Sequence, residues 1–381
     1  MSKPTHVSRY YADDKDVFDL LSQGTVSLAK LRLFLRIRGI VVSSSLTKEE
    51  ICRYLQTSPL SWPQLEALLE IIETPDREDK FSTCRLTAPN SDIQNAVTAA
   101  AAVQQERGAQ QGEIYKIQVD PAGVLEVAVD YSEPNFSKTR CLQRVDKTLV
   151  IRLEREGDHF KVRHHENARA LEILSSLEKK LLPAAGTPPP RREIVVSGLT
   201  SVQRSKFFVE MARGIPGYEL KDERGLQVDR PDESENEAES EDEVEDANGG
   251  VADTSIAKGK DAKEQFQGLV KRALLHGTSL LMSRQYQDYA KGGFSLSKLI
   301  WTVEPETGNG PMIEFSAEFG DGERGIGFRY GVLGKFERHE DGSFAKSRRA
   351  VVGTEKNELL ALLESSAYTA LDKAQEEGPS S

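Results

Sequence analysis

Apolar residues recur every three to four positions over the first quarter of the chain, which predicts a series of short amphipathic helices. A serine or threonine precedes several of these runs. In two places, Thr47–Glu50 and Ser61–Gln64, a glutamate or glutamine follows three residues later, which is the spacing of a capping box. We therefore expect a compact helical domain over residues 1–85. Its helices are predicted within 16–21, 27–38, 47–55 and 61–72.

Beyond residue 85 the pattern changes twice. An alanine-rich stretch predicts a connecting helix over residues 86–111, with strong helix propensity and a thin apolar face. Residues 112–185 then alternate between apolar and polar side chains, which is typical of strands, and end in a helix that begins at Asn167. A Gly157-Asp158 turn favours a hairpin between the last two strands. The strands are expected at 114–119, 124–131, 148–156 and 159–164.

A proline-rich linker, 186–192, leads into a second α+β section over residues 193–373. An acidic loop at 230–260, expected to be disordered, interrupts this section, and a short tail, 374–381, follows it. The elements expected within it are a strand 193–199, a helix 202–215, a strand pair around Arg224-Gly225, a long helix 261–290 bent near Gly277, strands 298–305, 311–320 and 325–337, and a helix 356–374.

The predicted fold class is α+β: a small N-terminal helical domain followed by antiparallel sheets with helices on one face. Hairpins followed by a helix occur in both sections, which hints at two similar halves.

Composition indicates where such a chain works. Its 381 residues are 38% hydrophobic and 29% charged, which suits a multi-domain globular protein. Three cysteines lie far apart in sequence, which favours a reducing compartment over a disulfide framework. The first residues lack the apolar core of a signal peptide, and no apolar run is long enough to span a bilayer. We expect a protein of the cytoplasm, or one associated with the nucleus or nucleoid, without membrane contact.

The net charge of −11 does not exclude nucleic acid, because the negative charge is concentrated. Residues 232–246, "DESENEAESEDEVED", hold ten acidic residues and no basic one, so the rest of the chain has a net charge of −1. A nearly neutral remainder can carry basic patches. The acidic block itself favours a solubilising spacer over a tract that binds a partner.

The stretch "SLAKLRLFLRIRGIVVSSSLTKEEICRYL", residues 27–55, is rich in both leucine and arginine. On a helical wheel Arg32 and Arg36 share the polar gap, while Leu33 and Ile37 widen the apolar arc on one side. The helix is therefore expected to be buried over most of its circumference. It should present one compact arginine pair to solvent.

This stretch resembles the SAP motif, a helix–extension–helix module of DNA-associated proteins, over residues 25–57. The matching features are an apolar helix that ends in Arg38-Gly39-Ile40 and Lys48 at the start of a second helix. The loop is two residues longer than in that family, serines replace its second glycine, and Tyr54-Leu55 replaces its final Arg-Leu. No family is recognised in the rest of the chain. The resemblance implies DNA binding through phosphates, for which the candidate donors are Arg32, Arg36, Arg38, Ser43, Ser44, Ser45 and Lys48.

Other motifs give weaker signals. "GDGERG", 320–325, matches a dinucleotide-binding pattern, but strand-like residues follow it, so a hairpin loop is favoured. His164 and His165 are neighbours on a strand, point to opposite faces and do not predict a metal site. Glu219-x-Lys221 has the spacing found in metal-dependent nucleases, without a marked acidic partner other than Asp222. Alternating aromatic residues favour a sheet core over a stacking surface for single strands: Trp301, Phe315, Phe319, Phe328, Tyr330 and Phe336.

These patterns together predict a non-enzymatic accessory protein with no catalytic residues, metal or cofactor. Its N-terminal module would bind DNA, and its C-terminal region would dock protein partners. A protein–protein adaptor without nucleic-acid contact is the alternative. A cryptic metal-dependent nuclease is the third possibility.

Overall fold

The computed structural model divides the chain into two compact units. The first unit comprises residues 1–79, 89–155 and 167–188, and the second comprises 80–88, 156–166 and 189–381. Every strand pairing among the described residues is antiparallel, and helices accompany the strands in both units, so the predicted α+β class is confirmed. The structure describes residues 12–22, 26–72, 80–88, 91–134, 136, 143–181, 191–230 and 271–376.

Within its described residues the helical domain contains four helices: α1 (Asp14–Leu21), α2 (Leu28–Ile37), α3 (Lys48–Gln56) and α4 (Trp62–Ile72). Side-chain caps start the first three, and α1 and α3 have complete capping boxes. Leucines spaced three and four apart pack into one apolar core. Its fully buried members are Leu20, Leu21, Leu35, Leu55 and Leu68.

The predicted end of the helical domain at residue 85 is wrong. Residues Phe81–Thr87 form strand β1, which belongs to the second unit. The connecting helix is also misjudged, because α5 (Ile93–Gln111) does not bridge two bodies but packs within the first unit. Its small alanines allow that close contact: Ala96, Ala99 and Ala100 are buried.

The rest of the first unit is a three-stranded meander with two helices. Strands β2 (Ile114–Val119), β3 (Leu125–Pro134) and β4 (Arg144–Glu156) pair in that order. Alternate residues of β3 are buried, as its period-two pattern predicts. Helix α5 packs against α6 (Ala168–Leu181) and against β2 and β3.

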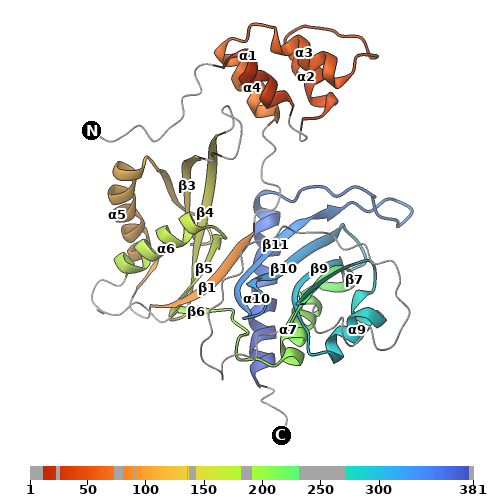
Figure 1. Ribbon diagram of the computed structural model, residues 1–381. Coiled ribbons are helices and arrows are strands. Elements are labelled where there is room, and N and C mark those ends of the chain that lie inside the picture. The colour runs from red at the N-terminus through yellow and green to blue at the C-terminus, as the bar shows by residue number, and fades with distance from the viewer. Residues whose placement is uncertain are drawn as a thin grey trace, which may run out of the picture. The chain divides into compact units, whose positions relative to one another are not determined.

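The second unit is built on a larger antiparallel sheet with the order β5-β1-β11-β10-β9-β7-β8, and β6 also pairs with β1. Helices α7 and α10 pack on one face of it, as expected (Figure 1). The strands are β5 (His159–His165), β6 (Arg191–Glu193), β7 (Tyr218–Asp229), β8 (Arg272–His276), β9 (Ser295–Pro305), β10 (Met312–Asp321) and β11 (Ile326–Phe336). The helices are α7 (Ser201–Arg213), the 3-10 turn η2 (Leu280–Met282), α9 (Arg284–Lys291) and α10 (Gly353–Glu376).

The aromatic residues of these strands are buried, which confirms that they belong to the sheet core rather than to a stacking surface. Trp301 and Phe315 lie in the same cluster as Phe207 and Phe208 of α7 and Leu360 of α10. Only Phe336 of the six predicted aromatics lies outside this cluster, although it too is buried.

Three predicted elements differ in the structure. Residues 194–199 form no strand beyond the short β6, which includes Arg191 and Arg192 of the predicted linker. The strand pair around Arg224-Gly225 is one continuous strand, β7, because irregular pairing with β9 leaves Arg224 as a bulge between the paired residues Glu223 and Gly225. The described part of the long helix, from residue 271, is instead β8, η2 and α9.

The remaining boundary expectations have mixed outcomes. The hairpin loop at "GDGERG" is confirmed, since β10 ends at Asp321 and β11 begins at Ile326. Residues 374–376 belong to α10 rather than to the tail. The acidic stretch 231–260 lies outside the described residues, as do 182–190 of the linker region and 377–381 of the tail.

The order of elements along the chain repeats. The sequence strand, helix, four strands, helix occurs first as β1-α5-β2-β3-β4-β5-α6. It occurs again as β6-α7-β7-β9-β10-β11-α10, with β8, η2 and α9 inserted after β7. This order agrees with the two similar halves that the hairpin–helix pattern suggests.

Candidate nucleic-acid interface

Helix α2 carries the arginines singled out in the sequence, and its ends are well defined. The Ser27 side chain caps its first turn by accepting a hydrogen bond from the Lys30 backbone N–H. At its other end Gly39 adopts a φ of 75°, and the Ile40 N–H donates to the Leu35 carbonyl at 2.9 Å. This is a Schellman motif, which favours glycine because of the left-handed backbone. The Arg38-Gly39-Ile40 signature therefore has a structural role as a helix stop.

Arg32 holds the loop that follows α2. Its Nη2 donates to the carbonyl of Ser44 at 2.7 Å and to that of Leu46 at 3.2 Å. The side chain is thus committed to carbonyl oxygens of its own domain, and the prediction that both arginines of the pair are uncovered is wrong for Arg32. Its charge remains close to the loop, but its chief effect is to fix the loop's shape.

Arg36 is the exposed member of the pair. Among the described residues its side chain makes no hydrogen bond or ion pair, and it lies in the last turn of α2. A cation is favourable there because it faces the negative end of the helix dipole. Its guanidinium is available to a ligand, which is the arrangement that the resemblance implied.

Arg38 and Lys48 are half-buried. The Arg38 guanidinium lies 5.6 Å from the centre of the Phe34 ring, and its Nη2 donates to Gln64 Oε1 at 3.4 Å. These contacts orient Arg38 along the surface of the domain, and no carboxylate among the described residues pairs with it. Lys48 is the first residue of α3 and also has a partner within the structure.

The three serines are exposed, but two of them bond to each other. The hydroxyls of Ser43 and Ser45 lie 2.8 Å apart, and the Ser45 N–H donates to Ser43 Oγ at 3.2 Å. Ser44 contributes its carbonyl to Arg32. Exposed hydroxyls can exchange such hydrogen bonds for one to a phosphate oxygen, so the serines stay candidate donors. The free energy gained on binding is smaller than for a donor without a partner, because an existing hydrogen bond is lost.

The N-terminus of α3, which begins at the candidate donor Lys48, is not an open anion site. Thr47 and Glu50 form a capping box in which each side chain bonds the other residue's backbone N–H. The hydrogen bond from the Thr47 backbone lowers the pKa of the Glu50 carboxyl below its usual value. Glu49 adds a second negative charge to this turn, so phosphate is repelled there rather than drawn in.

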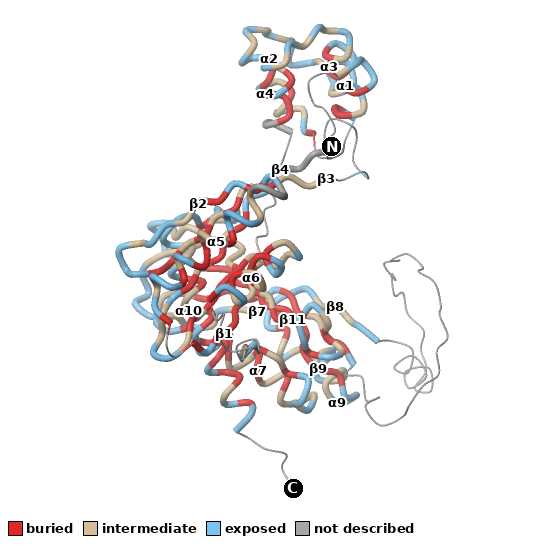
Figure 2. Tube along the Cα trace, turned by 90° about the vertical axis from the view of Figure 1, so that its left-hand side faces the viewer, coloured by how far each residue is buried: buried red, intermediate tan, exposed pale blue. Residues whose placement is uncertain are grey.

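An exposed apolar strip accompanies the arginines. Leu33 and Ile37 are 49% and 65% exposed, and Val41 is 92% exposed. The expectation that Leu33 and Ile37 widen the buried arc is therefore wrong, because α3 and α4 cover only the face of α2 that holds Leu31, Phe34 and Leu35. Figure 2 shows the mixture of buried and exposed positions along α2 and the following loop.

The other candidate motifs acquire structural explanations. His164 is buried, and burial lowers its pKa to about 4, so it is uncharged at neutral pH. Lys221 pairs with Glu304 at 3.1 Å, and Asp222 accepts the Ser279 N–H, so neither is arranged around a metal with Glu219. Within the described ranges no three His, Cys, Asp or Glu side chains gather in a way that could hold a metal ion.

Comparison with known proteins places no family on the chain: no protein-family model and no curated protein matches it. None of the helices that the structure describes is both long and apolar enough to cross a membrane.

Proposed function

We propose that the protein is a non-enzymatic accessory factor whose helical domain binds DNA through phosphate contacts. The observation that carries the proposal is the exposed guanidinium of Arg36, beside a loop whose shape Arg32 fixes. Arg38 adds a second charge, which has no carboxylate partner in the described part of the chain. Contacts of this kind read the backbone of the duplex and not its sequence.

The affinity of such a surface depends on salt, because each neutralised phosphate releases counterions. We expect the full chain to bind a random duplex of about 20 base pairs at low ionic strength and to lose most of that affinity by about 200 mM salt. Fluorescence anisotropy of the labelled duplex measures both. Absence of a salt-dependent change at low ionic strength would contradict the proposal.

A protein–protein adaptor is the second candidate, and the exposed strip of Leu33, Ile37 and Val41 favours it. Apolar side chains that cluster on a surface are typical of docking sites. Replacing Leu33 and Ile37 together by serine separates the two functions. If the domain binds DNA, the affinity of this variant for the duplex stays within about twofold of that of the wild type, because the phosphate donors remain.

For the C-terminal region we propose docking of protein partners at the β8 edge. In the described part of the sheet β8 pairs only with β7, and Leu274 and Met282 near it are 55% and 78% exposed. An unpaired edge with apolar neighbours suits a partner that adds a strand. Substitution of Leu274 by lysine should prevent capture of such a partner without unfolding the unit.

A further inference from the structure

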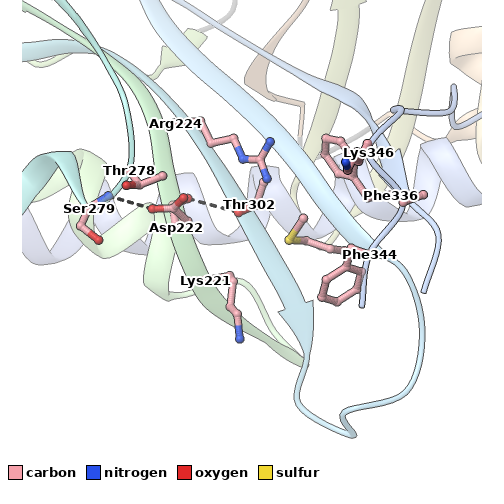
Figure 3. Close-up of a pocket in the computed structure, with 11 residues that line it drawn as sticks. Lys221, Asp222, Arg224, Thr278, Ser279, Thr302, Phe336, Phe344 and Lys346 are labelled. Carbon is pink, nitrogen blue, oxygen red and sulfur yellow. Dashed lines mark hydrogen bonds between the residues drawn. The ribbon is translucent and has the colours of Figure 1, made fainter. Parts of the chain in front are cut away.

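A hollow of about 560 Å³ opens on the second unit, on the face of the sheet opposite α7 and α10. Residues on that face alternate with the core: Thr302 lines the hollow while its neighbour Trp301 is in the core, and Met312 lines it while Ile313 is in the core. The turn at 277–279 and the segment after β11 form its walls (Figure 3). The volume is in the range that holds a small organic ligand.

Two cations of the hollow are available to an anion. Arg224 and Lys346 are exposed, and neither makes an ion pair within the part of the chain that the structure describes. The Arg224 guanidinium lies 4.9 Å from the centre of the Phe336 ring, a cation–π contact that keeps it at the wall of the hollow. Lys221, by contrast, points away from both and is paired with Glu304 (Figure 3).

The one carboxylate of the hollow is already engaged. Asp222 Oδ1 accepts the backbone N–H of Ser279 at 2.8 Å, and Ser279 adopts a left-handed φ of 50°. The Gly277 N–H donates to the Arg224 carbonyl at 3.3 Å and ties the same turn to β7. The turn therefore holds the hydroxyls of Thr278 and Ser279 at the hollow before any ligand arrives.

An aromatic ring forms the opposite wall. The Arg338 guanidinium lies 5.1 Å from the centre of the Phe344 ring, and Arg338 in turn donates to Glu304 and to the Gly308 carbonyl, both at 2.6 Å. This network fixes the ring beside the hollow, which Met312 also lines. A planar apolar group could pack there while an anionic group reaches the two cations.

We propose that the hollow binds a nucleoside phosphate, with the phosphate on Arg224 and Lys346 and the base against Phe344. A guanidinium offers two parallel N–H donors to a phosphate, and an aromatic side chain stacks on any base. The nucleotide could be free or one unit of a single strand. This site is independent of the DNA contact proposed for Arg36, which lies in the other unit.

Titration calorimetry of the full chain tests the proposal with two probes: adenosine monophosphate, and an oligothymidylate of about eight nucleotides. Arg224→Ala should weaken binding of the probe about tenfold or more. Phe344→Leu should weaken it several-fold while leaving the weaker binding of inorganic phosphate unchanged. Arg213 is an exposed arginine of α7, on the other face of the sheet. Arg213→Ala should therefore leave the binding of adenosine monophosphate, of the oligothymidylate and of inorganic phosphate unchanged.

Binding of the mononucleotide identifies a free ligand, and binding of the oligonucleotide alone identifies a single strand. The proposal is overturned if the wild-type chain binds neither probe saturably, or if Arg224→Ala, with an unchanged circular dichroism spectrum, binds as the wild type does. Arg36→Glu separates this proposal from that of duplex binding. If the variant loses duplex binding but still binds the nucleotide, the effect is confined to the helical domain, so either proposal can fail while the other holds.

Discussion

The carboxylate of Glu364 lies at the centre of a buried ionic cluster in the second unit, and its replacement by glutamine tests what fastens α10 to β5. Glu364 is fully buried and accepts hydrogen bonds from Arg163 Nε and from the Tyr330 hydroxyl. The ammonium of Lys161 lies 3.2 Å from its second oxygen. Burial alone raises the pKa of this carboxyl, but Arg163 and the other donors lower it below its usual value.

Glu364→Gln keeps the size of the side chain and removes the charge. Arg163, whose side chain is only 9% exposed, then stays buried without a counter-charge. Removing one partner of a buried ion pair costs about 3–5 kcal/mol, because the other charge cannot regain its water. An amide oxygen still accepts from Tyr330, so we expect a loss of about 3 kcal/mol in the free energy of unfolding, a large share of the roughly 5–15 kcal/mol typical of a folded protein.

Urea unfolding measures this loss through Trp301, which is fully buried in the core of the unit. The chain has two tryptophans, so Trp62→Phe leaves Trp301 as the single reporter. Glu355→Gln is the matched control, because Glu355 lies on the same helix, is 45% exposed and pairs with Lys335 at the surface.

The control should cost less than about 1 kcal/mol. Adding Arg163→Met to Glu364→Leu should destabilise less than Glu364→Gln alone, because it removes the buried guanidinium together with its carboxylate, while Lys161 keeps Glu156 at 3.8 Å. A loss below about 1 kcal/mol for Glu364→Gln, equal to that of the control, would refute the account of this cluster.

Three further outcomes follow from the structure. Buried His164, with a pKa of about 4, takes up no proton between about pH 6.5 and 4, whereas the unfolded chain does. The free energy of unfolding of the second unit, measured in urea, should therefore fall by up to about 3 kcal/mol as the pH drops over that range, and His164→Gln should flatten the fall. Gly322→Ala would place a methyl group 2.0 Å from the Asp229 carboxylate and should cost about 2 kcal/mol in urea unfolding, whereas Gly198→Ala, with nothing within 4 Å, should be nearly neutral. Deletion of 232–246 removes ten negative charges and should tighten duplex binding several-fold at low salt, measured by anisotropy, with an unchanged melting temperature; equal affinities would count against electrostatic competition.

Local sequence patterns predicted two kinds of element: helices that begin at a capping residue, and strands in which apolar and polar residues alternate regularly. The capping residue Thr47, for example, marks a helix start that the structure confirms. The regular alternation of buried and partly buried residues in β3 also follows directly from the pattern. Strand β1 was missed because its partners, β5 and β11, lie far away in sequence, and β8 was taken for a helix because alanine and leucine favour helices until pairing with β7 overrides them.

The candidate site was predicted only in part, for a related reason. A helical wheel gives the direction of each side chain but not what stands opposite it. It placed Arg32 and Arg36 together correctly, yet only the path of the loop shows that two carbonyls occupy Arg32. In the same way, Leu33 and Ile37 belong to the apolar arc by composition, but the described helices are too few to cover that side of α2.

The salt dependence of duplex binding by Arg36→Glu tests the central claim most directly. If Arg36 neutralises a phosphate, the slope of log affinity against log salt becomes shallower by about one unit in the full-length variant. Lys15→Glu, the same change of charge at an exposed position of α1, should leave the slope unchanged. Equal slopes for the wild type and Arg36→Glu, in folded proteins, would contradict the assignment of DNA binding to this surface.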